Sequence, residues 1–298
     1  MTQPTLANQA LSQSIHLSGS TPLAQSLPES LSARLLEVAH QHPLLVALDF
    51  DGVVAPLGDD PAAVTPLPET VAAIQRLVAH GIPVAVVSGR DLASLGSVAQ
   101  IGPGVLMVGS HGDEWAGPAR PGVSDADLDA DLDVNANVVH AAAVAAHRGA
   151  AAHPGAWVEL KRSSVAVHVR RMPSHLRAAA LAAARQALHG IPGVRLLPGN
   201  DVLEATTTPA DKGVAVETLR AMSGAAAVIF LGDDVTDEAA FARLGSGDLG
   251  IKVGAGDTCA AERVPDCIAV SHVLHTLADH IDRDVGMSSE LTSERTRL

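Results

Sequence analysis

Residues 44–52 read LLVALDFDG, in which five apolar residues lead directly into Asp49, Asp51 follows two positions later and Gly52 ends the run. A short continuous apolar segment that ends in a turn is typical of a buried strand in a parallel sheet. In open α/β sheets the ligand crevice lies beyond the carboxyl ends of such strands, where Asp49 and Asp51 would emerge. Two carboxylates this close repel each other unless a cation or a shared proton relieves them, and Mg²⁺ is a natural partner for their oxygens. The alternative is an ordinary strand end with a capping Asp and a turn.

The composition of the chain excludes several classes of protein. Its 298 residues are 47% hydrophobic and 18% charged, which suits a globular protein with one large domain or two ordinary ones. The formal net charge is −13, without the basic footprint that nucleic-acid binding needs, and no apolar run approaches the ~20 residues that span a bilayer. The two cysteines make no disulfide framework. We therefore expect a cytoplasmic protein that binds neither nucleic acid nor membrane.

Strands and helices alternate over two parts of the chain. Further apolar strand candidates, each followed by polar residues, lie at 83–87, 105–108, 226–231 and 249–253. With helical patterns between them, this order predicts an α/β fold with a doubly wound, parallel-sheet (Rossmann-like) core. We assign residues 31–116 and 207–284 to this core and predict a closing helix at 273–281.

The pattern changes between residues 117 and 206. A Gly- and Pro-rich segment is followed by a helix, two strands, a second helix and two more strands, and strands joined by a short turn form antiparallel hairpins. This order does not belong to a parallel sheet, so we interpret 117–206 as an α+β cap domain inserted into the core. The polar segments 1–30 and 285–298 are predicted to be a disordered arm and a disordered tail, and the arm lacks the features of a signal peptide.

The first predicted hairpin of the cap has one polar face. If residues 162–163 form a two-residue turn, Trp157 lies opposite His168, and such cross-strand partners share a face of the sheet. The polar face then carries Trp157, Glu159, Lys161, His168 and Arg170. The other face carries Val158, Leu160, Val165, Val167 and Val169, which we expect to pack on the cap helices. The polar set suits sugar hydroxyls, and an ordinary solvated sheet face is the alternative.

Polar side chains also gather at the ends of the predicted core strands. Ser88 follows the second strand, Lys212 precedes a helix, and Asp233, Asp234 and Asp237 follow the strand at 226–231. Carboxylates form a Mg²⁺ site, and a Ser hydroxyl, a Lys ammonium and helix N–H groups form a phosphate cradle. A carboxylate beside the metal can attack phosphorus, and a second can protonate the leaving group and then activate water. Taken singly, each residue also has an ordinary explanation as a turn, an exposed helix start or a cap.

In this order, the segments DFDG (49–52), SGR (88–90), Lys212 and GDD (232–234) with Asp237 resemble the four motifs of the haloacid dehalogenase superfamily of phosphotransferases. The resemblance implies that Asp49 is the nucleophile and Asp51 the general acid/base. It implies that phosphate is held by Ser88, Gly89 and Lys212. A cap inserted between the Ser and Lys motifs resembles the superfamily's type-2 arrangement.

The same resemblance implies a metal site. Mg²⁺ would be held by Asp49, the backbone carbonyl of Asp51, and Asp233, with Asp234 and Asp237 as outer ligands. An Asp at position 51 is similar to the phosphatases and mutases of the superfamily, which differ in this position from its ion pumps.

A narrower resemblance is to the trehalose-6-phosphate phosphatases. It rests on LDFDG (48–52), VSGR (87–90), GSHG (109–112), VELK (158–161), VHVR (167–170), DKG (211–213) and GDDVTDE (232–238). It implies substrate contacts by Arg90, His111, Gly112, Glu159, Lys161, His168, Arg170 and Glu204. The sequence departs from the family at Val53-Val54, where Thr-Leu is more usual, and at Val169, where an aromatic residue is more usual.

Together these observations predict a Mg²⁺-dependent phosphatase that hydrolyses trehalose 6-phosphate to trehalose and phosphate through an aspartyl-phosphate. Functional coupling to a trehalose-6-phosphate synthase is a further expectation. A related sugar-phosphate phosphatase or a phosphohexomutase is the alternative among enzymes. A catalytically inactive regulatory partner of a synthase is the alternative outside them.

Overall fold

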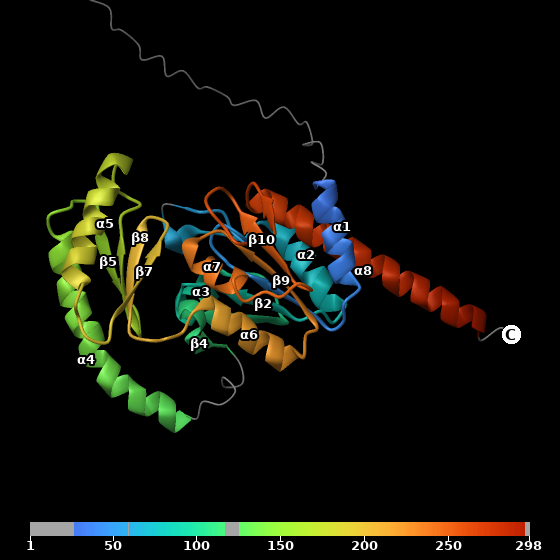
Figure 1. The fold of residues 1–298 in the computed structure, drawn as a ribbon, viewed down its shortest axis with the longest axis horizontal. Coiled ribbons are helices and arrows are strands. Elements are labelled where there is room, and N and C mark those ends of the chain that lie inside the picture. Colours follow the sequence, from blue (N-terminus) through green and yellow to red (C-terminus); the bar gives the residue numbers. More distant parts are fainter. Residues whose placement is uncertain (1–26, 59, 117–124, 296–298) are drawn as a thin grey trace, which may run out of the picture.

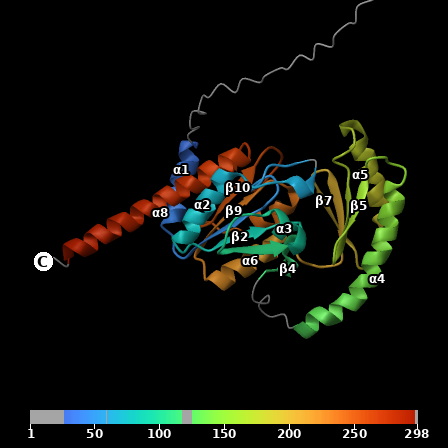
Figure 2. The same ribbon diagram turned by 180° about the vertical axis from the view of Figure 1, so that it is seen from behind.

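The computed structural model describes residues 27–58, 60–116 and 125–295, which form two parts, each with its own sheet (Figure 1, Figure 2). The larger part is built around a seven-stranded sheet and the smaller part around a four-stranded sheet. Most of the arm expected at 1–30 lies outside the described residues. Within these ranges, no helix combines the length and the apolar character that crossing a membrane requires.

The core sheet is mostly parallel, as predicted. Its strands are β1 (Leu44–Leu48), β2 (Val84–Val87), β3 (Val105–Gly109), β4 (Glu114–Trp115), β9 (Ala227–Gly232), β10 (Leu249–Val253) and β11 (Glu262–Val264). Their order is β11-β10-β9-β1-β2-β3-β4, and β4 is antiparallel to β3. Strand β1 is central and pairs with β2 and β9, so the ends of these three strands lie side by side. The short strands β4 and β11 were not predicted, because two or three residues give no periodic pattern.

Helices cover both faces of the core sheet, which explains why β1 is apolar throughout. Helices α1 (Glu29–Ala39), α2 (Pro68–Ala79) and α8 (Cys267–Arg295) pack with α3 (Leu92–Val98) on one face. Helices α6 (Lys212–Ser223) and α7 (Glu238–Phe241) cover the other. Leu44, Val46 and Leu48 face the first group, whereas Leu45 and Ala47 face the second. Short 3₁₀ helices η1 (Pro61–Ala63), η2 (Ser110–Gly112) and η3 (Val235–Asp237) lie in the loops at the strand ends.

The closing helix α8 is longer than the predicted helix at 273–281, and it also includes residues that were expected to be disordered. It begins at Cys267, where the Asp266 carboxylate accepts a hydrogen bond from the Ala269 N–H at 2.9 Å, and it runs to Arg295. The prediction of a disordered tail at 285–298 is therefore wrong for residues 285–295. Polar composition suggested disorder, but the segment contains no proline and continues a helix that has already nucleated on the core.

The smaller part is the α+β unit predicted as a cap. Strands β5 (Trp157–Leu160), β6 (Ser164–His168), β7 (Arg195–Gly199) and β8 (Val202–Thr206) form an antiparallel sheet in the order β5-β6-β8-β7. Helices α4 (Asp125–Ala150) and α5 (Ser174–Leu188) lie on its outer side (Figure 1, Figure 2). The domain boundaries at 116/117 and 206/207 stay a prediction.

The predicted register of the first cap hairpin is confirmed. Trp157 pairs with His168, and the Lys161 N–H donates to the Ser164 carbonyl at 2.9 Å. Val165 and Val167 pack against α4 and α5 as expected. Leu160 does not, because it lies at the strand end beside the turn and is 65% exposed.

The contact between α6 and α7 gives a testable prediction. A Cβ atom at Gly213 would lie 2.3 Å from the backbone carbonyl oxygen of Ala239, which cannot rotate away. Gly213→Ala should therefore lower the free energy of unfolding by about 1–3 kcal/mol, the usual cost of overpacking, as measured by urea denaturation.

The matched control is Gly96→Ala, since Gly96 lies in helix α3 with no neighbouring atom within 4 Å of its Cβ position. That substitution should stabilise the protein by ~0.5–1 kcal/mol. Equal effects of the two substitutions would contradict the packing described.

Candidate active site

The floor of the candidate site is a buried lysine between two carboxylates. Asp49 follows β1, and Lys212 begins α6, which the Asp211 side chain caps by accepting from the Val214 N–H at 2.9 Å. Lys212 Nζ lies 2.9 Å from Asp49 Oδ1 and 2.7 Å from Asp237 Oδ1. All three side chains are almost fully buried. A buried ion pair of this kind is costly to break, because a removed partner leaves an uncompensated charge.

Burial and the repulsion between neighbouring carboxylates disfavour the charged forms of Asp49 and Asp233. Burial raises the pKa of Asp49 well above its usual value, against the opposing effect of Lys212, and the charges of Asp237 and Asp233 raise it further. Burial and the Asp237 charge raise the pKa of Asp233 to about 7. Burial lowers the pKa of Lys212, but Asp237 and Asp49 outweigh this effect and raise it overall. The site is therefore suited to a further cation.

Three of the floor carboxylates could hold that cation. Asp49, Asp233 and Asp237 each offer an oxygen, and these oxygens lie within 4.8 Å of one another. Mg²⁺ prefers such hard oxygen ligands, so this donor set fits it. Gly52 makes the approach of Asp233 possible: its φ is 82°, and a Cβ there would lie 2.1 Å from Asp233 Oδ2.

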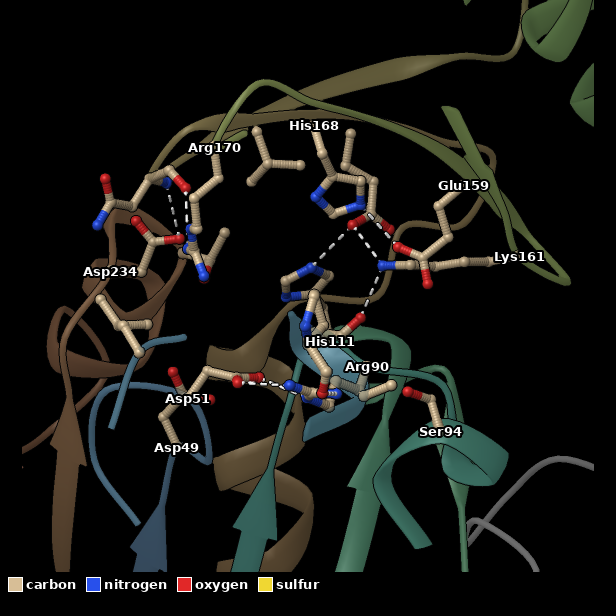
Figure 3. A pocket seen from close by; sticks show the side chains of 18 of the residues that line it. Asp49, Asp51, Arg90, Ser94, His111, Glu159, Lys161, His168, Arg170 and Asp234 are labelled. Carbon is tan, nitrogen blue, oxygen red and sulfur yellow. Dashed lines mark hydrogen bonds and ion pairs between the residues drawn. The ribbon is translucent and has the colours of Figure 1, made fainter. Parts of the chain in front are cut away.

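The carboxylates of Asp234 and Asp51 point away from this cluster, although Asp51 was expected to bind the metal through its backbone carbonyl and not through its carboxylate. Asp234 Oδ1 accepts from the Val235 N–H at 2.7 Å, and Oδ2 accepts from the N–H of Asn200 in the cap at 3.3 Å. The Asp51 carboxylate accepts two hydrogen bonds from Arg90, from Nε at 2.6 Å and from Nη2 at 2.7 Å (Figure 3). The Asp234 carboxylate thus contacts the cap, and Arg90 holds the Asp51 carboxylate at the wall of the cleft.

The SGR segment lies at the end of β2. The Ser88 hydroxyl is buried and accepts from the Arg90 N–H at 3.1 Å. Gly89 approaches His111 so closely that a Cβ would lie 2.6 Å from the imidazole Cε1. Its carbonyl accepts from Lys161 Nζ of the cap at 2.9 Å. Gly89 therefore joins core and cap in addition to lying beside the floor.

The roof of the site comes from the cap, and its charged groups are paired. Lys161 Nζ donates to Glu204 Oε2 at 2.9 Å, and Ser164 Oγ donates to Glu204 Oε1 at 2.6 Å. His111 Nε2 of the core lies 3.4 Å from the same carboxylate (Figure 3). Burial raises the pKa of Glu204, but Lys161 and His111 outweigh it and hold that pKa far below its usual value.

A second roof cluster surrounds Glu159. Its carboxylate lies 2.7 Å from His168 Nε2, and this hydrogen bond lowers its pKa against the effect of burial. The His168 ring stacks on Trp157 with centroids 4.6 Å apart, and the Arg171 guanidinium lies 4.5 Å from the centroid of the Trp157 ring. Arg170 donates to the Gly58 carbonyl of the core at 3.1 Å. His168 and Arg170, expected to contact substrate, thus also support their neighbours.

One cleft of ≈ 490 Å³ separates floor and roof. It is lined by most of the predicted site residues, namely Asp49, Asp51, Gly89, Arg90, His111, Glu159, Lys161, His168, Arg170, Glu204, Lys212, Asp233 and Asp234. Ser88, Gly112 and Asp237 do not line it.

Ser110 and His111 have φ of 48° and 57°, a strained conformation for residues other than glycine. The Gly112 carbonyl accepts from Trp115 Nε1 at 2.9 Å, a contact within the core.

Sequence reasoning missed one charged residue at the site. Lys252 lies in β10, is buried, and donates from Nζ to the backbone carbonyl of Asp233 at 2.6 Å. It therefore fixes the loop that carries Asp233. A single lysine inside the apolar segment LGIKV (249–253) was the available signal, because a buried charge needs a partner.

Comparison with known proteins agrees with this geometry. A model of the trehalose-phosphatase family matches residues 47–264. A trehalose-phosphate phosphatase of Mycobacterium avium is 34% identical over 263 residues, which cover 84% of this chain and 65% of the relative. One of Mycobacterium ulcerans is 36% identical over 222 residues, which cover 70% of this chain and 53% of the relative. The chain spans less than two thirds of the length of these relatives.

Among solved structures, the C-terminal domain of a C. albicans trehalose-6-phosphate phosphatase is similar with a TM-score of 0.67 at 20% identity. The similarity covers 84% of this chain and 96% of that chain, and it shows a shared fold. The family match extends from β1 to β11 and so includes the floor, the roof and the cleft between them. The chain belongs to the trehalose-phosphatase family.

Proposed function

We propose that this protein is a Mg²⁺-dependent phosphatase that hydrolyses trehalose 6-phosphate to trehalose and phosphate. The observation that carries the proposal is a cleft in which Asp49, a buried lysine and a carboxylate cluster that could hold a metal ion face polar groups of the cap. Its volume of ≈ 490 Å³ lies in the usual range for small-molecule sites. The names of the relatives agree with this substrate.

The reaction would run in two displacements at phosphorus. An Asp49 oxygen attacks the phosphate ester, the bond from phosphorus to the sugar oxygen breaks, and Asp51 gives that oxygen a proton. Asp51 then takes a proton from water, which attacks the aspartyl-phosphate and releases phosphate and the free Asp49 carboxylate. Lys212 holds Asp49 in place throughout. Bound Mg²⁺, held by Asp49 and Asp233 with Asp237 beside them, would neutralise charge on the phosphate.

The roof supports a sugar as the remainder of the substrate. Glu159, Lys161 and Glu204 present charged hydrogen-bonding groups to the cleft, and none of them is needed for the chemistry at phosphorus. Other sugar phosphates share that chemistry, so a related sugar-phosphate phosphatase and a phosphohexomutase are the competing activities. An inactive regulatory partner is disfavoured because the predicted catalytic positions keep their functional groups. Coupling to a trehalose-6-phosphate synthase stays a prediction.

The direct test is phosphate release from a panel of sugar phosphates, with and without Mg²⁺. Trehalose 6-phosphate should have the highest kcat/KM of the panel. A higher value for another sugar phosphate would keep the chemistry and replace the substrate. No phosphate release from any ester would overturn the proposal.

Removal of the nucleophile should abolish turnover. Asp49→Asn keeps the shape of the side chain but removes the attacking charge and a metal ligand, and loss of covalent catalysis commonly costs several orders of magnitude. Asp257→Asn is the control, because Asp257 is exposed and outside the cleft. Steady-state phosphate release measures both, and near-normal turnover of Asp49→Asn would refute the mechanism.

Removal of metal should have a reversible effect. Excess chelator should abolish phosphate release, and Mg²⁺ should restore it, because the floor offers three neighbouring carboxylate oxygens as ligands. Ca²⁺ should inhibit, since its longer bonds and higher coordination number disturb in-line attack. The chelated protein should also gain thermal stability when Mg²⁺ is added. Full activity in excess chelator would contradict the assignment of the cluster.

The cap should determine substrate preference. Glu159→Ala removes a charged hydrogen-bonding group from the roof and should cost about 2–4 kcal/mol in kcat/KM on trehalose 6-phosphate. The same variant should hydrolyse p-nitrophenyl phosphate almost as well as the parent, because that ester does not reach the roof.

The neighbouring control is Leu160→Ala, on the same strand but 65% exposed and away from the cleft, which should leave both substrates unaffected. Equal losses of the Glu159 variant on both esters would mean that the substitution damages the floor or the fold.

A further inference from the structure

The Arg90 guanidinium donates hydrogen bonds to other groups of the protein. Nε and Nη2 donate to the two oxygens of Asp51 at 2.6 and 2.7 Å, and Nη1 donates to the Pro61 carbonyl at 2.8 Å. The side chain is 9% exposed, and the guanidinium lies 5.5 Å from the centroid of the Phe50 ring. Two parallel bonds between a guanidinium and a carboxylate fix both position and orientation, which a single contact does not.

Both ends of Arg90 are anchored. Its N–H donates to Ser88 Oγ at 3.1 Å, so the backbone is tied to the end of β2. Its side chain reaches Asp51, which lies on a turn where Gly52 adopts a φ of 82°. Asp51 is 28% exposed and has no partner other than Arg90 among the side-chain hydrogen bonds of the described residues. Without Arg90, its carboxylate would be free to rotate toward solvent.

The third bond of Arg90 reaches a loop that the cap also holds. Pro61 begins η1, and three residues earlier the Gly58 carbonyl accepts from Arg170 Nη1 of the cap at 3.1 Å. Arg171, the next residue of the cap, lies 3.9 Å from Asp60 of the same loop. The loop that carries Gly58, Asp60 and Pro61 therefore lies between a cap arginine pair and Arg90.

We propose that Arg90 is a positioning residue that fixes the carboxylate of Asp51 for proton transfer and ties it to the loop held by the cap. The inference rests on the proposed phosphatase function and assigns Arg90 a role different from substrate binding. Proton transfer requires heavy atoms within about 2.6–3.2 Å, so a carboxylate free to rotate loses most of its effect. Because Arg90 links this carboxylate to the loop, proton transfer by Asp51 would depend on the positions of the loop and of the cap.

The need of the leaving group for a proton distinguishes this positioning role from a role in substrate binding. An alkyl oxygen needs a proton as it leaves, whereas p-nitrophenolate leaves without one. The value of kcat/KM reports only the steps up to the first irreversible one, here phosphoryl transfer to Asp49, so it omits the later need for Asp51 as a base. Arg90→Lys keeps the charge but loses the paired hydrogen bonds. It should lower kcat/KM for the sugar phosphate about 100-fold and that for p-nitrophenyl phosphate less than about threefold.

A double-mutant cycle tests whether Arg90 acts through Asp51. In an Asp51→Asn background, Arg90→Lys should change kcat/KM for the sugar phosphate less than about threefold, because the group that it positions is already disabled. Arg185→Lys is the control, since Arg185 is exposed on helix α5 and lies outside the cleft. Thermal unfolding of each variant shows whether the fold is kept, and Arg90→Gln serves as a second variant should Arg90→Lys be unstable.

Substrate affinity supplies an independent measurement. In an Asp49→Asn background, which does not turn over, calorimetry should give trehalose 6-phosphate affinities within about twofold with and without Arg90→Lys. A tenfold loss of affinity, or losses that multiply in the cycle, would overturn the positioning role and make Arg90 a substrate ligand. If the parent prefers another sugar phosphate, the substrate assignment fails while the same cycle on that ester still decides the role of Arg90. A parent inactive on every ester overturns both.

Discussion

The site depends on one buried cation. Lys212 lies between Asp49 and Asp237, and all three are almost fully buried, so removing Lys212 would leave two carboxylates without their cation in a low-dielectric interior. The same triad connects the two halves of the core, because Asp49 follows β1 whereas Lys212 begins α6 and Asp237 ends η3. Gly213 lets α6 approach α7 closely enough for these bonds to form. Packing and electrostatics therefore impose the same geometry on the floor.

Much of this arrangement could be predicted from the sequence. Three features were predicted because each depends only on residues close together in the sequence. They are the apolar segment at β1, the polar residues at three strand ends and the period-2 pattern of the cap hairpin. The floor at Asp49 and Lys212 and the pairing of Trp157 with His168 follow from such local rules.

What the sequence could not provide was the direction of individual charged side chains. Asp234 belongs to the acidic motif, yet its carboxylate accepts from Asn200 of the cap, 34 residues away in the chain. Lys252 was overlooked because its partner is a backbone carbonyl, which has no sequence signature. The helix α8 was cut short because polar composition resembles disorder when the packed turns before it are not visible. In each case a contact between distant segments overrode the local pattern.

The roof residues also connect the cap to the core. Lys161 bonds Gly89 of the core and Glu204 of the cap, so the groups that would bind a sugar already hold the two parts together. A sugar hydroxyl entering the cleft exchanges these bonds for new ones, and each exchange contributes only a modest net free energy. A small ester leaves Lys161 and Glu204 paired with each other, so it meets no unpaired buried charge. Under the proposed function, the roof groups therefore increase binding of the right sugar but do little to prevent binding of a small ester. Exclusion of other substrates must then depend on the shape of the cleft.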